Sequence, residues 1–382
     1  MTSGGSSEPG ESIEPEPMTE PGLALPFPAE PALAVGPPSF PAGPAAAAAP
    51  PRPVWPTVRE VLSGSFDLVT GARIQLRNAS LYIGLLLLVT VGPLAVAAIA
   101  EAPTIDPDTL EGLSEWTALA GLVAVLALIA ISVEAQIIGL AILGGARVGR
   151  PLTVRQALRR SRVVFWRVVG ASFLVGIPTA IVALLLGLAF GGAFGDATDA
   201  AQVGSQLLVG VITAPFVYVV AGIVLGDVGA IEAIRRSILL SRARLRLAVI
   251  ASLFAVIAQY LLLFAALAGA DIVVRVLEPF HAQLEEFDPA SLGGFVLIAA
   301  GALVAVFAYG TLSFTIGALA AAPQVVAFLG LTGYSGGLDG AREAADGEPT
   351  RPTPLWISPV MILGVVVAVV SAVAAVSGAF GP

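Results

Sequence analysis

Long apolar stretches recur along this chain and are separated by short polar segments. A helix needs about 20 mostly apolar residues to cross a bilayer. The windows that reach this length are residues 80–100, 118–143, 168–191, 203–226, 247–270, 294–331 and 358–380. The pattern therefore predicts an all-α integral membrane protein with about seven transmembrane helices.

The segments between these windows alternate in charge. The first loop runs from Glu101 to Glu115 with acids and no base, whereas the second carries only arginines, from Arg147 to Arg167. Every basic residue in the chain is an arginine, and only Arg275 falls in a predicted outer loop. Because arginine-rich loops stay in the cytoplasm, we expect a cell-membrane protein with its N-terminus inside and its C-terminus outside.

The N-terminal segment, residues 1–54, consists mostly of Pro, Ala, Gly, Ser and Glu. Such a composition cannot bury enough apolar surface to offset the entropy of ordering, so it predicts a disordered cytoplasmic tail. Its proline-rich string at 50–53 could bind a protein partner. The alternative is a solvated extension without a partner.

Three similar strings precede the odd-numbered windows. They read E-V-L-S-G-S at 60–65, Q-A-L-R-R-S at 156–161 and E-A-I-R-R-S at 232–237. We interpret them as three repeats of an amphipathic helix followed by a transmembrane hairpin, at 55–145, 150–228 and 229–335. Together they form a six-span domain over 55–345, which a linker and a seventh span follow at 346–382.

The second and third strings predict helices with one apolar face and one arginine face. In the third, Ile231, Ile234 and Ile238 share a face, and so does Leu245 beyond them. Such helices lie in the membrane interface with their guanidinium groups among lipid phosphates. The candidate phosphate contacts are Arg159, Arg160, Arg235 and Arg236, and the expected partners are membrane lipids, anionic ones included. The alternative is that these arginines only set the topology.

Glu134 is the acidic residue deepest inside a predicted span. A charge there costs about 2.5–3.5 kcal/mol on insertion scales, so we expect Glu134 to face the bundle interior. Together with Gln259 and Gln324 it forms a candidate intramembrane polar site. It could bind a transported substrate, or it could hold neighbouring helices together by hydrogen bonds. Prolines interrupt four of the windows, at Pro93, Pro178, Pro215 and Pro323.

Several of these stretches resemble a known family. The segment from Thr57 to Thr70, the stretch 73–78 and the apolar run to Pro93 are similar to the start of the bacterial and archaeal glycerophosphoryl diester phosphodiesterase membrane-domain family. The string 231–242, and Tyr334 followed by an Asp and an Arg at 339 and 342, also resemble it. The resemblance implies a six-span membrane module. It does not carry over the hydrolase activity, which in that family belongs to a separate soluble barrel domain.

The composition narrows the chemistry. Only 12% of residues are charged, where a soluble domain has about a quarter. There is no cysteine and a single histidine, His281, which excludes thiolate catalysis and two-histidine metal sites. We expect neither an enzyme nor a cofactor, metal or nucleic-acid partner. The sequence favours a non-enzymatic membrane module that anchors or organises partners or lipids. The alternative is a permease or flippase for a small amphiphile or lipid that uses the intramembrane carboxylate.

Overall fold

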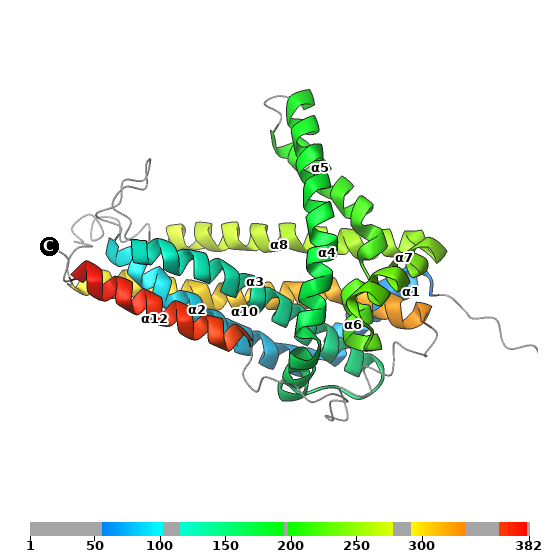
Figure 1. Cartoon of the computed structure of the whole chain (residues 1–382), viewed down its shortest axis with the longest axis horizontal. Helices are drawn as coiled ribbons and strands as arrows, with labels where there is room; N and C mark the ends of the chain where they lie inside the picture. The colour runs from blue at the N-terminus through cyan, green and yellow to red at the C-terminus, as the bar shows by residue number, and fades with distance from the viewer. Residues whose placement is uncertain (1–55, 102–114, 195–197, 278–291, 333–358, 380–382) are drawn as a thin grey trace, which may run out of the picture. The chain divides into compact units, whose positions relative to one another are not determined.

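The computed structural model describes residues 56–101, 115–194, 198–277, 292–332 and 359–379. The predicted tail at 1–54 and His281 lie outside these residues, as does the predicted linker at 346–358. Within the described residues every regular element is helical, so the chain is an all-α membrane protein (Figure 1). The helices are α1 (Val58–Gly71), α2 (Arg73–Glu101), α3 (Glu115–Arg147), α4 (Val154–Phe194), α5 (Thr198–Thr213), η2 (Ala214–Phe216), α6 (Val219–Gly226), α7 (Ala230–Ala243), α8 (Leu245–Leu277), α10 (Leu292–Leu331) and α12 (Pro359–Ala379).

Six of the predicted spans are confirmed as segments long and apolar enough to cross a membrane. They are Arg73–Ile99, Ala118–Arg147, Val154–Leu188, Val203–Gly226, Leu245–Gly269 and Gly293–Leu331. The seventh predicted span corresponds to α12, whose apolar part among the described residues is the shorter stretch Ile362–Ser371. α12 packs against α2 and α3.

The three repeated strings each form the first two turns of a helix. They begin at the third residue of α1, α4 and α7, and they end on Ser65, Ser161 and Ser237, which are all buried. The helix starts are capped alike in two cases: Thr57 and Glu60 exchange hydrogen bonds, as Thr153 and Gln156 do. The threefold repetition stays a prediction.

The second string does not form a separate interfacial helix. Residues 154–168 continue without a break into the third span, so that α4 is one helix of 41 residues. Three residues of its predicted apolar face, Ala157, Phe165 and Val168, are buried against the protein. The expectation of three interfacial helices is therefore wrong for this segment, whereas α1 and α7 are separate short helices.

The predicted proline interruptions differ in their outcome. The helix breaks at Pro215, where the fourth span divides into α5, the short helix η2 and α6. By contrast, Pro93, Pro178 and Pro323 lie inside the continuous helices α2, α4 and α10. The break at Pro215 leaves carbonyl groups without a partner in the helix. Ser237 Oγ of α7 donates to one of them, the Pro215 carbonyl, at 2.7 Å.

Small residues bring α2 and α10 into close contact. A Cβ atom at Gly84 would lie 2.8 Å from Thr311 Oγ1, and one at Gly310 would lie 3.1 Å from the Gly84 Cα. Close approach at small residues is a common way to pack helices in a membrane. The buried core continues through the second half of α3, through α6 and through the end of α10.

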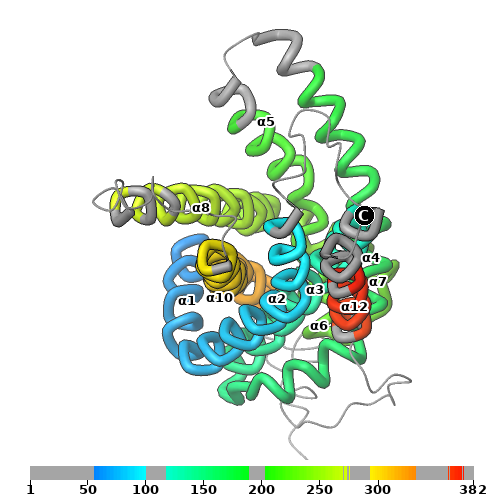
Figure 2. The backbone as a smooth tube through the Cα atoms, turned by 90° about the vertical axis from the view of Figure 1, so that its left-hand side faces the viewer, coloured from blue at the N-terminus to red at the C-terminus, as the bar shows by residue number. Residues whose placement is uncertain are grey.

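One end of the helices collects the arginines. The spans are joined as hairpins, so the start of α2, the end of α3, the start of α4, the end of α6 and the start of α8 come to the same end. α1 and α7 also belong there, because single residues connect them to α2 and α8. Within the described residues, only Arg275 lies at the other end, where it pairs with Asp271 at 2.8 Å. In both views α4 and α5 extend together away from the other helices, and α8 is separated from α12 (Figures 1 and 2).

Candidate functional site

Glu134 lies in the interior, as expected, but away from the other two residues of the predicted site. It is 1% exposed. Its electrostatic neighbours include Tyr82 on α2, which also interacts with Arg162 on α4. The carboxylate therefore lies on the side of α3 that faces α2.

Gln259 and Gln324 do come together, because both line one cavity of about 800 Å³. Glu134 does not line it, although its neighbours Val133 and Ala135 do. The helical turn of α3 explains this separation, since consecutive side chains on a helix point about 100° apart. The predicted trio is thus corrected to two glutamines in a cavity and a carboxylate outside it.

The cavity, hereafter the groove, lies between α3 and α8, which both pack against α10. Residues of α2 and α4 complete its lining. Its polar side chains include Ser132, Gln136, Gln259, Tyr309, Ser313 and Gln324. The predicted site did not include Ser132, Gln136, Tyr309 or Ser313.

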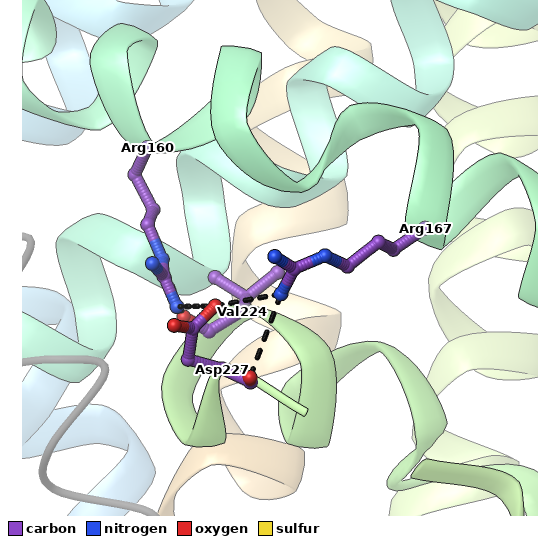
Figure 3. A network of polar contacts seen from close by, with 4 residues as sticks. All are labelled: Arg160, Arg167, Val224 and Asp227. Carbon is purple, nitrogen blue, oxygen red and sulfur yellow. Dashed lines mark hydrogen bonds and ion pairs between the residues drawn. The ribbon is translucent and has the colours of Figure 1, made fainter. Parts of the chain in front are cut away.

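A second polar cluster joins α4 to the end of α6 (Figure 3). Arg160 Nε donates to the Val224 carbonyl at 2.9 Å, and its Nη2 lies 3.4 Å from Asp227 Oδ1. Arg167 Nη1 donates to the same Oδ1 at 2.7 Å. The last carbonyls of a helix have no partner within it and carry partial negative charge, so two arginines and one aspartate fit this end of α6.

Asp227 has an unusual backbone conformation that suits this role. It follows the last residue of α6 in the left-handed region, with φ 47° and ψ 33°. Helices often end in this conformation, and Asp and Asn tolerate it better than most residues. The turn directs the chain out of α6, and the side chain faces Arg160 and Arg167 (Figure 3). We refer to Arg160, Arg167, Val224 and Asp227 as the clamp.

The clamp corrects one predicted lipid contact. Arg160 is buried, at 3% exposure, and binds α6 inside the protein, so it does not reach a lipid phosphate. The other three candidates, Arg159, Arg235 and Arg236, are exposed. The sequence missed the clamp because Asp227 lies 60 residues or more from either arginine and no local pattern links them.

The two faces of α7 differ sharply. Ala233, Ser237 and Ser241, spaced four residues apart, are each 1% exposed and pack against η2 and α6. The opposite face carries a stripe at the same spacing: Ile231 at 77% exposure, Arg235, Leu239 at 55% and then Arg242. The prediction grouped the isoleucines on a face that enters the membrane interface. In the structure Ile231 is exposed, and small residues occupy the face that packs on the protein.

We refer to this exposed stripe, together with the exposed Arg159 and Trp166 of α4, as the arginine surface; α4 and α7 pack against each other. Trp166 is 62% exposed on α4, which also exposes Arg155. One acid lies among these bases: Glu232 accepts from Arg236 Nε at 2.8 Å and lies 4.0 Å from Arg235. The hydrogen bond from Arg236 holds the pKa of the Glu232 carboxyl below its usual range, so that Glu232 stays charged and offsets only part of the positive charge.

Within the described ranges, no three His, Cys, Asp or Glu side chains lie close enough to hold a metal ion. No protein-family model, curated protein or solved structure matches this chain.

Proposed function

We propose that this protein is a non-enzymatic membrane module that organises lipids, with anionic phospholipids held around the arginine surface. The observation that carries the proposal is the exposed stripe of α7, where apolar and cationic side chains alternate at helical spacing. A surface of this kind suits the boundary between headgroups and acyl chains. We place it on the cytoplasmic side of the cell membrane, where arginine-rich segments reside.

The chemistry of the stripe favours phosphate over other headgroup atoms. A guanidinium group donates two parallel hydrogen bonds to a phosphate, which a lysine ammonium cannot match. The neighbouring Ile231 and Leu239 can enter the acyl region, and the ring of Trp166 suits the same depth. The pattern recurs on two helices, which supports a role beyond topology for these residues.

The alternative, a permease or flippase that uses Glu134, gains less support. A coupling carboxylate would face the cavity that a substrate enters, whereas Glu134 does not line the groove and interacts with Tyr82. We therefore assign Glu134 a role in joining helices. We also propose that the clamp is structural, since Asp227 is engaged by two arginines.

The proposal is tested by the lipid selectivity of the full-length protein in nanodiscs. Native mass spectrometry compares the binding of phosphatidylglycerol with that of phosphatidylcholine of the same acyl chains. We expect the anionic lipid to bind more tightly, and the double variant Arg235→Gln/Arg242→Gln to lose most of this preference. Each arginine near an anionic surface contributes about 1 kcal/mol, so the double variant should bind phosphatidylglycerol roughly thirtyfold more weakly.

Arg275→Gln is the matched control, because Arg275 is as exposed as Arg235 but lies at the opposite end of the spans. Its selectivity should equal that of the wild type. Equal binding of the two lipids by the wild-type protein would contradict the proposal. So would an equal loss in the double variant and in the control.

A further inference from the structure

The groove is a second site that differs in chemistry from the arginine surface. Its walls come from the middle of α3 and α8, and α10 supplies most of its floor. These three helices are membrane spans, so the groove lies at a depth where lipid tails surround the protein. Its volume of about 800 Å³ falls within the range of about 300–1,000 Å³ that is usual for small-molecule sites.

Three glutamines line this space without a protein partner. Within the described residues, the side-chain amides of Gln136, Gln259 and Gln324 make no hydrogen bond to the protein. Gln324 is also buried, at 9% exposure. An amide that lacks a hydrogen bond in an apolar medium costs several kcal/mol. The buried amide of Gln324, with two more amides lining the same cavity, favours a ligand with hydrogen-bonding groups.

The positions of the glutamines give that molecule an orientation. Gln324 is the buried member, whereas Gln136 on α3 and Gln259 on α8 are exposed at the rim. Apolar side chains lie beside them, such as Ile129 on α3, which is 53% exposed. A polar head at Gln324 and an apolar chain that leaves between α3 and α8 would satisfy both kinds of lining.

The lining also limits the charge of the molecule. No Asp, Glu, Arg, Lys or His is among the residues that line the groove. A charged headgroup there would be buried without a counter-ion, which is strongly unfavourable. An amide offers both donors and acceptors, so it matches hydroxyl and amide groups, which also have both.

We propose that the groove binds one uncharged amphiphile whose polar head carries hydroxyl or amide groups. Gln324 binds the head, and Gln136 and Gln259 bind it from the rim. This inference stands apart from the proposed function, because the arginine surface would take an anionic headgroup and the groove would exclude one.

The test uses two neutral probes and one charged analogue. Monooleoylglycerol and oleamide carry an apolar chain with a hydroxyl or an amide head. Oleoyl lysophosphatidate equals monooleoylglycerol except for its phosphate. Binding of each probe to the full-length protein in phosphatidylcholine nanodiscs is measured by native mass spectrometry and by competition. We expect saturable binding of one neutral probe molecule per protein, and at least tenfold weaker competition by lysophosphatidate.

The diagnostic variant is Gln324→Met, which removes the hydrogen-bonding amide and keeps the length of the side chain. Loss of hydrogen bonds to a buried amide should weaken the neutral probe about tenfold. Gln206→Met is the matched control, since Gln206 lies in a span but does not line the groove. A thermal unfolding curve for each variant separates loss of binding from loss of folding.

Three results would overturn the inference. They are the absence of saturable binding for both neutral probes, an equal affinity for lysophosphatidate, and a Gln324→Met variant that is folded and binds like the control. Absence of saturable binding for both neutral probes would mean that the groove holds only water. Loss of phosphatidylglycerol selectivity in the arginine variants with probe binding unchanged would leave this inference intact.

Discussion

The clamp provides the sharpest prediction for stability, through the variant Asp227→Asn. Asparagine keeps the size of the side chain and tolerates the left-handed backbone of this position. The substitution therefore removes the charge and leaves the turn. Arg160 would then remain buried, with 2% of its side chain exposed, beside the Val224 carbonyl, and would lose its ion pair with Asp227.

The expected loss of unfolding free energy follows from how deeply Asp227 and its two arginine partners are buried. Removing one partner of a fully buried ion pair costs about 3–5 kcal/mol. Asp227 and Arg167 retain 23% and 21% side-chain exposure, so water screens part of their interaction. We expect Asp227→Asn to lower the free energy of unfolding by about 2–3 kcal/mol, between the buried and the exposed cases.

The assay is equilibrium unfolding of the full-length protein in mixed micelles, followed by tryptophan fluorescence. The matched control is Glu232→Gln, which also removes a carboxylate that pairs with two arginines but lies exposed on α7. Exposed pairs contribute little to stability, so this variant should unfold like the wild type. The account of the clamp is refuted if Asp227→Asn costs no more than Glu232→Gln.

Two further predictions concern the helix start and the helix crossing. Acidification should speed hydrogen exchange at the start of α1. The hydrogen bond from the Thr57 backbone to Glu60 lowers the pKa of the Glu60 carboxyl in the folded protein. This cap is therefore complete above the carboxyl's unfolded-state pKa and is lost as the pH falls through its folded-state pKa. Glu60→Gln, which removes the titrating carboxyl and keeps an oxygen that can accept from the Thr57 backbone, should remove most of this pH dependence, and an unchanged profile would contradict the cap. Gly84→Ala should lower the unfolding free energy by about 1–3 kcal/mol, because its Cβ would lie 2.8 Å from Thr311 Oγ1. Gly301→Ala places a Cβ where no atom lies within 4 Å, so it should leave the unfolding free energy unchanged or raise it. Equal changes in unfolding free energy for Gly84→Ala and Gly301→Ala would refute the close crossing of α2 and α10.

Much of the fold follows from the sequence, because the length of an apolar window and the charge of its flanks are local properties. The spans from Arg73 to Leu331 were predicted in this way. The face of α7 that packs on the protein was not predicted, since the hydropathy pattern marks only the large apolar residues. In this protein Ala233, Ser237 and Ser241 face inward, because small residues allow helices to approach closely in a membrane.

The sites depend on contacts between distant parts of the chain. Arg160 looked like its exposed neighbour Arg159, and only the position of Asp227 after α6 explains its burial. The groove likewise depends on how α3 and α8 pack on α10, which brings Gln136, Gln259 and Gln324 to one space. The resemblance to the phosphodiesterase membrane-domain family rests on short local strings and stays a prediction.

The central claim, that this membrane module organises anionic lipids, is tested most directly by the lipids that it retains. The full-length protein is extracted from its native membrane in polymer nanodiscs, without detergent, and the co-purified lipids are quantified against the bulk membrane. We predict enrichment of anionic phospholipids around the wild type and around Arg275→Gln, and loss of that enrichment in Arg235→Gln/Arg242→Gln. A lipid composition equal to that of the bulk membrane in all three proteins would contradict the claim.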